Sequence, residues 1–250
     1  MGKMAYRKCT WTAGRVIEVF KSHDTKRPGK QKRLPRQKLT TEQQQKRNQR
    51  QQVKVLARQI NANFGPGDYH LTATYSNECR PADKKEAVKI LKKFIRGLCK
   101  YYRQQGLAFK YIYVTEHRGR RIHHHLIIPA ADIRGIQQLW PYGFVRFVPL
   151  DDSGQYKDLA AYLIKEAGKK EPGDNSKLWV SSKNMIKPEP EIEDIKAITW
   201  AQQPRVPKGY YLGELVNGVS EITGYPYQYY TLIKLPPKQR ITTTEARAAG

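Results

Sequence analysis

The chain has 250 residues, and its 46 Lys and Arg against 22 Asp and Glu give a formal net charge of +24. A charge this large repels itself in a compact molecule, so an anionic partner is expected. Nucleic acid fits better than a membrane, because no long apolar run or strongly amphipathic basic helix is present. The less specific alternative is a general solubility charge or a ribosomal association. Three widely spaced cysteines without a Cys-x-x-Cys pair argue against a zinc knuckle and a disulfide framework.

The N-terminal part of the chain is strongly basic, with 17 Lys and Arg and three acids among the first 60 residues. Met1–Thr10 is polar and basic and does not resemble a secretory signal, so we expect a cytoplasmic location in a bacterial cell. Trp11–Phe20 has the composition of a strand, and Lys21–Lys38 is typical of a mobile basic loop. Thr40–Asn61 is predicted to be an exposed helix that packs only near its end. The Gly-Pro-Gly sequence within Phe64–Asp68 should prevent the helix from continuing.

A more regular region follows. The predicted elements are a strand over Tyr69–Tyr75, a helix capped by Asp83 and Glu86 that reaches Tyr102, strands over Tyr111–Glu116 and Ile122–Ile128, a short helix over Ile133–Trp140, a strand over Gly143–Leu150 and a helix over Tyr156–Ala167. This order predicts an α+β domain at about residues 65–170, built on a mainly antiparallel sheet with flanking helices.

The rest of the chain is expected to extend this domain on both sides. Residues 1–64 form a basic N-terminal extension of strand, loop and helix. Residues 171–250 form a C-terminal extension whose many aromatic residues between Ala197 and Leu235 indicate a folded appendix, with core packing as the main role of those rings. Pro236–Gly250 is expected to be frayed.

Four of the six histidines lie between positions 117 and 125. Side chains alternate between the faces of a strand, so His123 and His125 share one face and His124 packs, or is hydrogen-bonded, beneath the sheet. The preceding strand ends at Glu116, and the hairpin brings this carboxylate close to the pair. Two imidazoles and one carboxylate leave coordination positions open, which is typical of a catalytic ion.

Mn²⁺ or Mg²⁺ suits phosphate chemistry at such a site, and Zn²⁺ is the alternative. The less specific interpretation of the pattern is a surface strand with chance histidines.

The predicted helix over Tyr156–Ala167 separates two tyrosines. Its apolar residues gather on one face, which includes Tyr156, whereas Tyr162 falls outside that stripe beside Lys165. A phenol ionises near pH 10 and needs an assisting cation or base to act as a nucleophile, and Lys165 can supply a positive charge. Taken alone, Tyr162 is better interpreted as an ordinary tyrosine at the edge of the core. Only its combination with the histidine strand favours a nucleophile.

Three segments in this order resemble the motifs of the HUH endonucleases, the replication initiators of rolling-circle plasmids and of filamentous and other small phages. The segments are Leu71-Thr-Ala-Thr-Tyr75, Glu116 with His123-x-His125-Leu-Ile-Ile128, and Ala161-Tyr162-Leu-Ile-Lys165. His124 fills a position that is hydrophobic in the family pattern. Trp179-Val-Ser-Ser-Lys-Asn184 also resembles a segment of initiator-like proteins from Gram-positive bacteria and their mobile elements.

This resemblance implies a divalent metal held by Glu116, His123 and His125. It implies that Tyr162 attacks a DNA phosphodiester and keeps the 5′-phosphate, while the freed 3′-hydroxyl primes a polymerase. A single tyrosine in the third motif favours the single-tyrosine group of initiators. Lys165 is expected to stabilise the developing negative charge.

The implied partners are single-stranded DNA or an origin hairpin, with a host helicase and polymerase, and no membrane. Arg118, Arg120 and Arg121 are candidate contacts to the DNA backbone. A relaxase or a single-strand transposase of a mobile element would use the same chemistry. The alternative from a different class is a non-enzymatic DNA- or RNA-binding module on a similar sheet.

Overall fold

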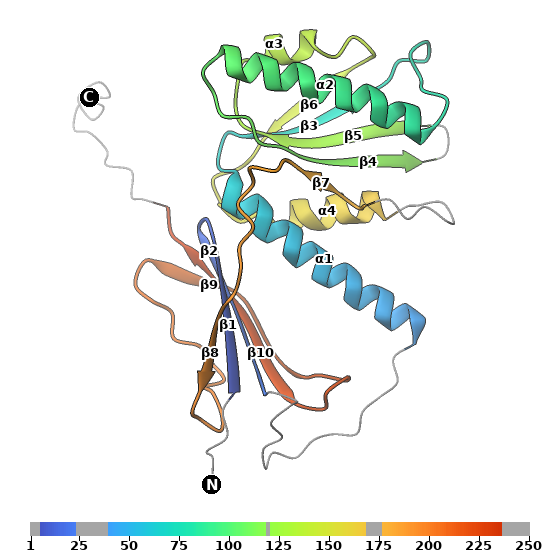
Figure 1. Cartoon of the computed structure of the whole chain (residues 1–250). Helices are drawn as coiled ribbons and strands as arrows, with labels where there is room; N and C mark the ends of the chain where they lie inside the picture. Colours follow the sequence, from blue (N-terminus) through green and yellow to red (C-terminus); the bar gives the residue numbers. More distant parts are fainter. Residues whose placement is uncertain (1–5, 24–39, 119–120, 169–176, 237–250) are drawn as a thin grey trace, which may run out of the picture.

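The computed structural model describes residues 6–23, 40–118, 121–168 and 177–236 (Figure 1). Within these ranges the chain forms two five-stranded antiparallel sheets and four helices. The predicted α+β class, with a mainly antiparallel sheet and flanking helices, is therefore confirmed.

One sheet, which we call the central sheet, is built from the middle of the chain. Its elements are β3 (Tyr69–Thr74), α2 (Lys84–Gln104), β4 (Ile112–Arg118), β5 (Arg121–Ile128), α3 (Ile133–Gln138), β6 (Val145–Pro149), α4 (Lys157–Ala167) and β7 (Val180–Ser181). The strand order is β6-β3-β5-β4-β7, so β5 lies in the middle with β3 and β4 on either side. The predicted sequence of elements is confirmed up to α4, with small differences at their ends, and β7 is an additional strand.

The first face of the central sheet packs against α2 and α3. Helix α2 begins after Asp83, whose side chain accepts a hydrogen bond from the backbone N–H of Glu86, as the capping pattern predicts. Its apolar stripe, including Leu91 and Leu98, is fully buried against the inward residues of β3 and β5, including Leu71. Burial of this stripe holds the helix on the sheet and leaves the other face for different partners.

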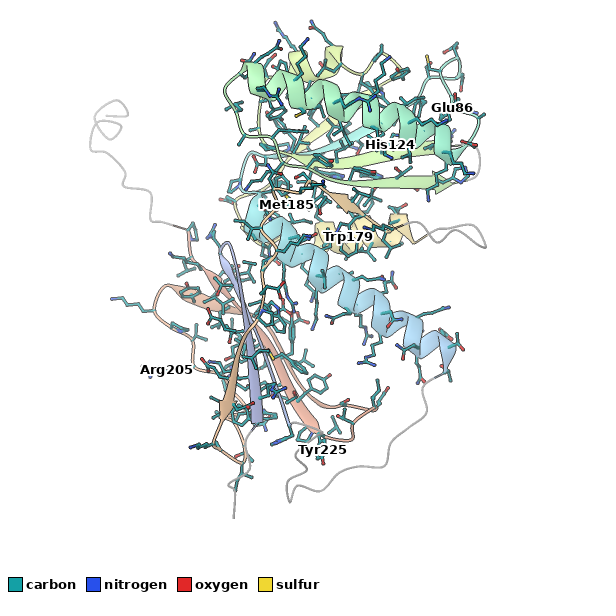
Figure 2. All side chains as sticks on the ribbon, in the orientation of Figure 1. Glu86, His124, Trp179, Met185, Arg205 and Tyr225 are labelled. Atoms are coloured by element: carbon teal, nitrogen blue, oxygen red, sulfur yellow. The ribbon has the colours of Figure 1, made fainter. Side chains whose placement is uncertain are left out.

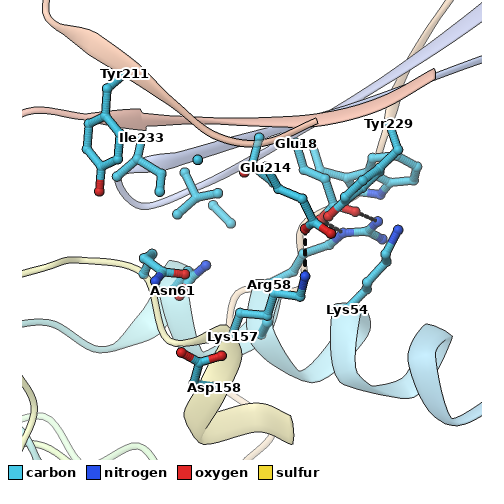
Figure 3. Close-up of a pocket in the computed structure, with 17 residues that line it drawn as sticks. Glu18, Lys54, Arg58, Asn61, Lys157, Asp158, Tyr211, Glu214, Tyr229 and Ile233 are labelled. Atoms are coloured by element: carbon cyan, nitrogen blue, oxygen red, sulfur yellow. Dashed lines mark hydrogen bonds and ion pairs between the residues drawn. The ribbon is translucent and has the colours of Figure 1, made fainter. Parts of the chain in front are cut away.

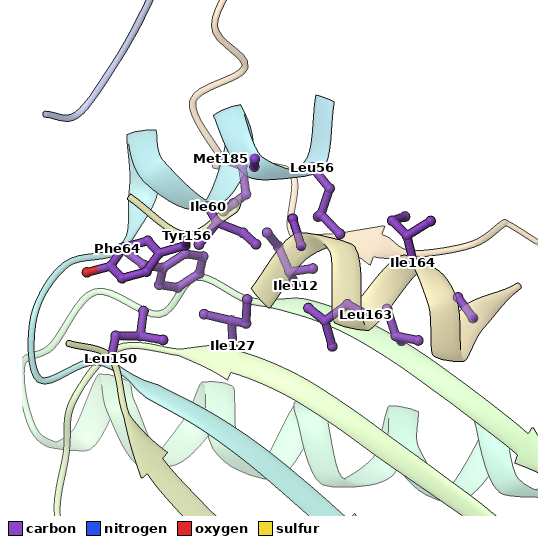
Figure 4. Close-up of a cluster of buried hydrophobic side chains, with 14 residues drawn as sticks. Leu56, Ile60, Phe64, Ile112, Ile127, Leu150, Tyr156, Leu163, Ile164 and Met185 are labelled. Carbon is purple, nitrogen blue, oxygen red and sulfur yellow. The ribbon is translucent and has the colours of Figure 1, made fainter. Parts of the chain in front are cut away.

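The second face of the central sheet packs against α4 and the end of α1 (Thr41–Asn63) (Figure 4). Leu56 and Ile60 of α1 meet Leu163 of α4 and Ile127 of β5 in one buried cluster. The first part of α1 is exposed, and its buried residues lie between Leu56 and Asn61. The prediction that this helix packs only near its end is confirmed.

The N-terminal strand prediction is corrected by the structure. Trp11–Phe20 is not one strand but parts of two, β1 (Tyr6–Ala13) and β2 (Val16–His23), which pair as a hairpin. The chain turns at Gly14, whose φ of +57° is a left-handed conformation that favours glycine. A Cβ atom there would also overlap the carbonyl oxygen of Asn61, so the turn packs directly on the end of α1.

The second sheet, which we call the terminal sheet, joins the two ends of the chain. The remaining strands are β8 (Glu191–Ile195), β9 (Tyr210–Val219) and β10 (Pro226–Lys234), and the order is β8-β1-β2-β10-β9. The N-terminal and C-terminal extensions thus form a single structural unit. The acidic strand β8 pairs with the basic strand β1, and Arg7 and Lys8 form ion pairs with Asp194 and Glu193.

Other expectations for the extensions have mixed outcomes. The predicted folded appendix is confirmed by β8–β10, and Tyr225, Tyr229 and Tyr230 are buried, as core packing requires. The predicted loop over Lys21–Lys38 is wrong for its first residues, which belong to β2, and its remainder from residue 24 lies outside the described residues. The expected fraying of Pro236–Gly250 falls almost entirely outside them as well.

A buried ion pair ties the terminal sheet to α1. Arg58 donates two hydrogen bonds of 2.5 and 2.7 Å to Glu18 of β2, and its guanidinium lies 3.7 Å from the ring centre of Trp11. Beside this pair is a cavity of about 380 Å³ between the terminal sheet, α1 and the start of α4 (Figure 3). Lys157 of α4 bridges to Glu214 of β9 at 2.6 Å across it.

Among the described residues, no helix combines the length and the apolar composition that crossing a bilayer would need.

Candidate active site

The candidate site lies on the second face of the central sheet, and its middle strand is β5. Alternation along β5 places His124 on the opposite face, where it is fully buried (Figure 2). The Nε2 atom of His124 lies 2.8 Å from the hydroxyl of Tyr75, and its Nδ1 atom lies 2.9 Å from the hydroxyl of Thr115. Burial lowers the pKa of His124 to about 3, so its ring is neutral. His124 is a packed, hydrogen-bonded residue, as the alternation predicts.

His125 and Glu116 are brought together on the other face. The Nε2 atom of His125 lies 3.4 Å from Oε2 of Glu116, and both residues are buried. Two atoms bound to one ion at about 2.1 Å each, with an angle of about 90–110° between the bonds, are about 3.0–3.4 Å apart. The observed separation therefore fits two ligands of a shared ion.

His123 occupies the third predicted ligand position. It lies directly opposite Glu116 in the β4–β5 register and is half-buried, and alternation puts it on the same face as His125. Within the described ranges, no group of three or more His, Cys, Asp or Glu side chains is arranged to hold a metal ion. Glu116 and His125 are therefore in contact, whereas His123 shares their face without completing a three-residue metal-binding group.

A residue that the sequence analysis missed, His70, lies against His125. His70 is on β3, and its Nε2 atom is 3.3 Å from Nδ1 of His125; the hydroxyl of Thr72 lies at the same distance from that nitrogen. Burial, with His125 and Arg146 nearby, lowers the pKa of His70 to about 4. The alternation of His70, Thr72 and Thr74 with buried Leu71 and Ala73 was the signal that could have placed His70 on this face.

Tyr162 reaches the same group of residues from α4. Its ring centre is 5.4 Å from that of His125 and 6.1 Å from that of His70, and the residue is 42% exposed. Tyr156 is 4% exposed, and its hydroxyl donates a hydrogen bond of 3.0 Å to the backbone oxygen of Asp151. The structure therefore separates the two tyrosines in the way that the helical wheel predicts.

Residues 68–171 match the family model described as Replication-associated protein ORF2/G2P. This segment is similar to replication-associated proteins. The match supports a role in replication initiation. It begins just before β3 and ends after α4, so it contains Glu116, His123, His125 and Tyr162, whereas the terminal sheet lies outside it. Neither curated proteins nor solved structures gave a match to the chain.

The predicted cationic residues differ in how the structure places them relative to this candidate site. Lys165 is exposed one turn after Tyr162 on α4. Arg121 is exposed at the start of β5. It lies opposite Arg118 at the end of β4, and the side chain of Arg118 lies outside the described part of the structure. Arg120 is outside the described residues altogether.

The segment after α4 packs against the scaffold of the site. Trp179 donates a hydrogen bond of 3.0 Å from its indole nitrogen to the side chain of Gln59 on α1, and the next two residues pair with β4 (Figure 2). This contact holds the segment against α1 at the edge of the central sheet.

Proposed function

We propose that the protein initiates rolling-circle replication by nicking single-stranded DNA with Tyr162 as the nucleophile. The observation that carries this proposal is the position of the Tyr162 ring, 5.4 Å from the ring of His125, which in turn faces Glu116. On one surface, a phenol can serve as the nucleophile of a metal-assisted phosphoryl transfer, and an imidazole and a carboxylate can serve as the metal ligands. The match to replication-associated proteins supports the biological role.

In the proposed reaction, the phenol oxygen of Tyr162 attacks the phosphorus of a DNA phosphodiester. The new O–P bond forms as the P–O3′ bond breaks, the phenol gives up its proton, and the departing O3′ takes up a proton to become a free hydroxyl. The DNA strand on the 5′-phosphate side stays attached as a phosphotyrosine ester. The free 3′-hydroxyl would then prime a polymerase.

The residues of the chain have distinct parts in this mechanism. Glu116, His123 and His125 would hold a divalent cation, Mn²⁺ or Mg²⁺. When bound, that cation neutralises charge on the non-bridging phosphate oxygens. Packing of α4 on the sheet holds Tyr162 beside the phosphate, which reduces the entropy lost on reaching the transition state. Lys165 supplies a positive charge near the developing phenolate.

The proposed partners follow from this chemistry. Single-stranded DNA, free or in an origin hairpin, is the substrate, and a host helicase and polymerase would extend the nicked strand. Arg121, with Arg118 and Arg120, would contact the DNA backbone.

The test is capture of a covalent adduct. The protein is incubated with Mn²⁺ and a pool of single-stranded oligonucleotides of randomised sequence, labelled at either end, and separated under denaturing conditions. We expect the 3′-label to remain with the protein and the 5′-label to leave on a fragment with a free 3′-hydroxyl.

The decisive variant is Tyr162→Phe, which should abolish the adduct while DNA binding is kept. The matched control is Tyr211→Phe, because Tyr211 of β9 is 41% exposed and lies in the other sheet. An adduct that persists in Tyr162→Phe would refute the assignment of the nucleophile. Binding without any adduct in the wild-type protein would favour the non-enzymatic alternative.

A further inference from the structure

The edge strand β6 presents an exposed strip of three side chains beside the candidate site. Phe144, just before β6, is 68% exposed, Val148 is 39% exposed, and Arg146 between them is exposed as well. The alternate residues Val145 and Phe147 pack on the opposite face, in the cluster with α2. Phe144, Arg146 and Val148, which we call the β6 strip, therefore point to the face that carries Tyr162.

The β6 strip is continuous with the candidate site through β3. Arg146 lies opposite Thr72 and Val148 opposite His70 in the β3–β6 register, and the backbone oxygen of Phe144 accepts hydrogen bonds from Thr74. Helix α4 packs on β4 and α1 on this same face, beyond β5 as seen from β6, so it does not cover the strip. Two strand spacings, or about 10 Å, separate β6 from β5, so the strip lies beside the reacting groups and not among them.

We propose that the β6 strip binds nucleotides of single-stranded DNA next to the phosphate that Tyr162 attacks. This inference rests on the proposed function and deepens it. Phe144 stacks on an unpaired base, because every base offers a flat face to an aromatic ring. Arg146 binds a backbone phosphate through its guanidinium group. Val148 covers the sugar or base on the far side of that phosphate from Phe144.

The properties of the strip fit this occupant better than a protein partner. Most of the apolar surface of Phe144 remains in contact with water in the folded chain. Covering that surface with a ligand therefore contributes favourably to the free energy of binding. The charged member is a cation, as an anionic strand requires, and the whole chain has a net charge of +24. Three side chains offer far less than the roughly 800 Å² per partner that a stable protein interface needs. Pro149 ends β6 and disfavours the addition of another strand at this edge.

The test measures binding alone. Full-length protein is titrated, with EDTA present so that no cleavage occurs, into a fluorescent single-stranded oligonucleotide of mixed sequence. Phe144→Ala should weaken binding by roughly 5-fold or more, and Phe144→Trp should retain or improve it. Arg146→Gln should weaken binding at low salt and reduce the slope of log K against log salt by about 0.7. A duplex of the same sequence should compete poorly.

Matched controls come from the terminal sheet and its connecting loop. Ile192 of β8 is 57% exposed, and Arg205 is exposed in the loop before β9 (Figure 2). Ile192→Ala and Arg205→Gln should leave the affinity for the oligonucleotide near that of the wild-type chain. Unchanged affinity in Phe144→Ala together with an unchanged salt slope in Arg146→Gln would overturn the proposal, as would equal binding of the duplex.

The outcome is separable from that of the nicking proposal. If the wild-type chain forms no adduct but Phe144→Ala loses affinity, the β6 strip remains a DNA-binding surface and the nuclease is refuted. If adducts form equally well in wild type and Phe144→Ala at limiting DNA, the nuclease stands and the strip is refuted. Thermal unfolding of each variant checks that the fold is intact, which the exposure of Phe144 leads us to expect.

Discussion

The ring of Tyr162 stands perpendicular to the ring of His125, with ring centres 5.4 Å apart and an angle of 89° between the planes. This contact joins α4 to the middle strand of the central sheet. Because His125 also lies 3.4 Å from Glu116, the candidate nucleophile and two candidate metal ligands share one surface. Removal of any one of them should therefore disable the same reaction.

The first prediction concerns the ligands. Glu116→Gln and His125→Ala should each lower the rate of adduct formation by about 100-fold or more, because a bound cation contributes several kcal/mol to the stabilisation of the transition state. Both variants should also lose Mn²⁺ binding in isothermal titration calorimetry, and EDTA should stop the wild-type reaction. Glu221→Gln removes an exposed carboxylate far along the chain and serves as the control. Undiminished activity in either ligand variant would remove that residue from the site.

The second prediction concerns His70, which contacts His125 through Nδ1. A partner on the second nitrogen of a ligating histidine orients its ring, and loss of such a partner typically costs about 10–100-fold in metal affinity or activity. His70→Phe should therefore lower both Mn²⁺ affinity and nicking rate by at least about 10-fold. His70→Gln, which keeps a hydrogen-bonding group, should be closer to wild type. Equal Mn²⁺ affinities for the three proteins would show that His70 does not position His125.

The third prediction concerns the buried ion pair that joins the terminal sheet to α1. Arg58→Met leaves Glu18 buried without its partner and should lower the free energy of unfolding by about 3 kcal/mol, measured by urea denaturation. The double variant Arg58→Met with Glu18→Met should recover part of this loss. The control is Lys46→Met, which breaks an exposed pair with Glu42 and should change stability by less than about 0.5 kcal/mol. A loss as small as that in Arg58→Met would contradict the prediction.

The fourth prediction is a pH dependence that comes from His23 of β2. This residue is buried against Trp200. Within the described part of the chain, its buried Nε2 atom has no hydrogen-bond partner. Burial lowers the pKa of His23 below its ordinary value of 6.5. The unfolded chain therefore takes up a proton that the folded chain does not. The contribution to stability is full above pH 6.5 and is lost as the pH falls toward the folded-state pKa.

His23→Phe removes this titration and keeps a flat ring. Relative to the variant, the wild-type chain should lose stability between pH 7 and pH 5, by at most about 1.4 kcal/mol per pH unit, which is the limit for one proton. Urea denaturation at several pH values measures this difference, and the other histidines contribute equally to both proteins. A difference between the two proteins that stays constant with pH would contradict the assignment.

Several features of the fold could be predicted because they depend on local patterns. The apolar stripe of α2 and its cap at Asp83 are periodic signals along one element, and they require no distant partner. Alternation along β5 separates His124 from its neighbours in the same way, and the wheel of α4 separates Tyr162 from Tyr156. Each of these predictions compares residues within one helix or one strand.

Other features could not be predicted because they depend on which elements become neighbours. The composition of Trp11–Phe20 predicts one strand because it continues across the turn, and only the φ of Gly14 reveals the hairpin of β1 and β2. The pairing of β8 with β1 joins segments from opposite ends of the chain. The opposite charges of Glu193 and Lys8 are consistent with this pairing, but charge and spacing in the sequence do not show which two strands become neighbours. His70 was missed for the same reason, because the strand pairing alone places it beside His125.

By itself, the sequence determined the basic character of the protein, the class and order of the central elements, and which side of each element its chemical groups occupy. Only the tertiary structure decided that the two ends of the chain form one sheet, that His70 lies against His125, and that Tyr162 reaches both. Periodicity sets the direction of a side chain within an element. Distances between elements depend on how buried apolar faces pack together, and this packing couples residues far apart in the chain.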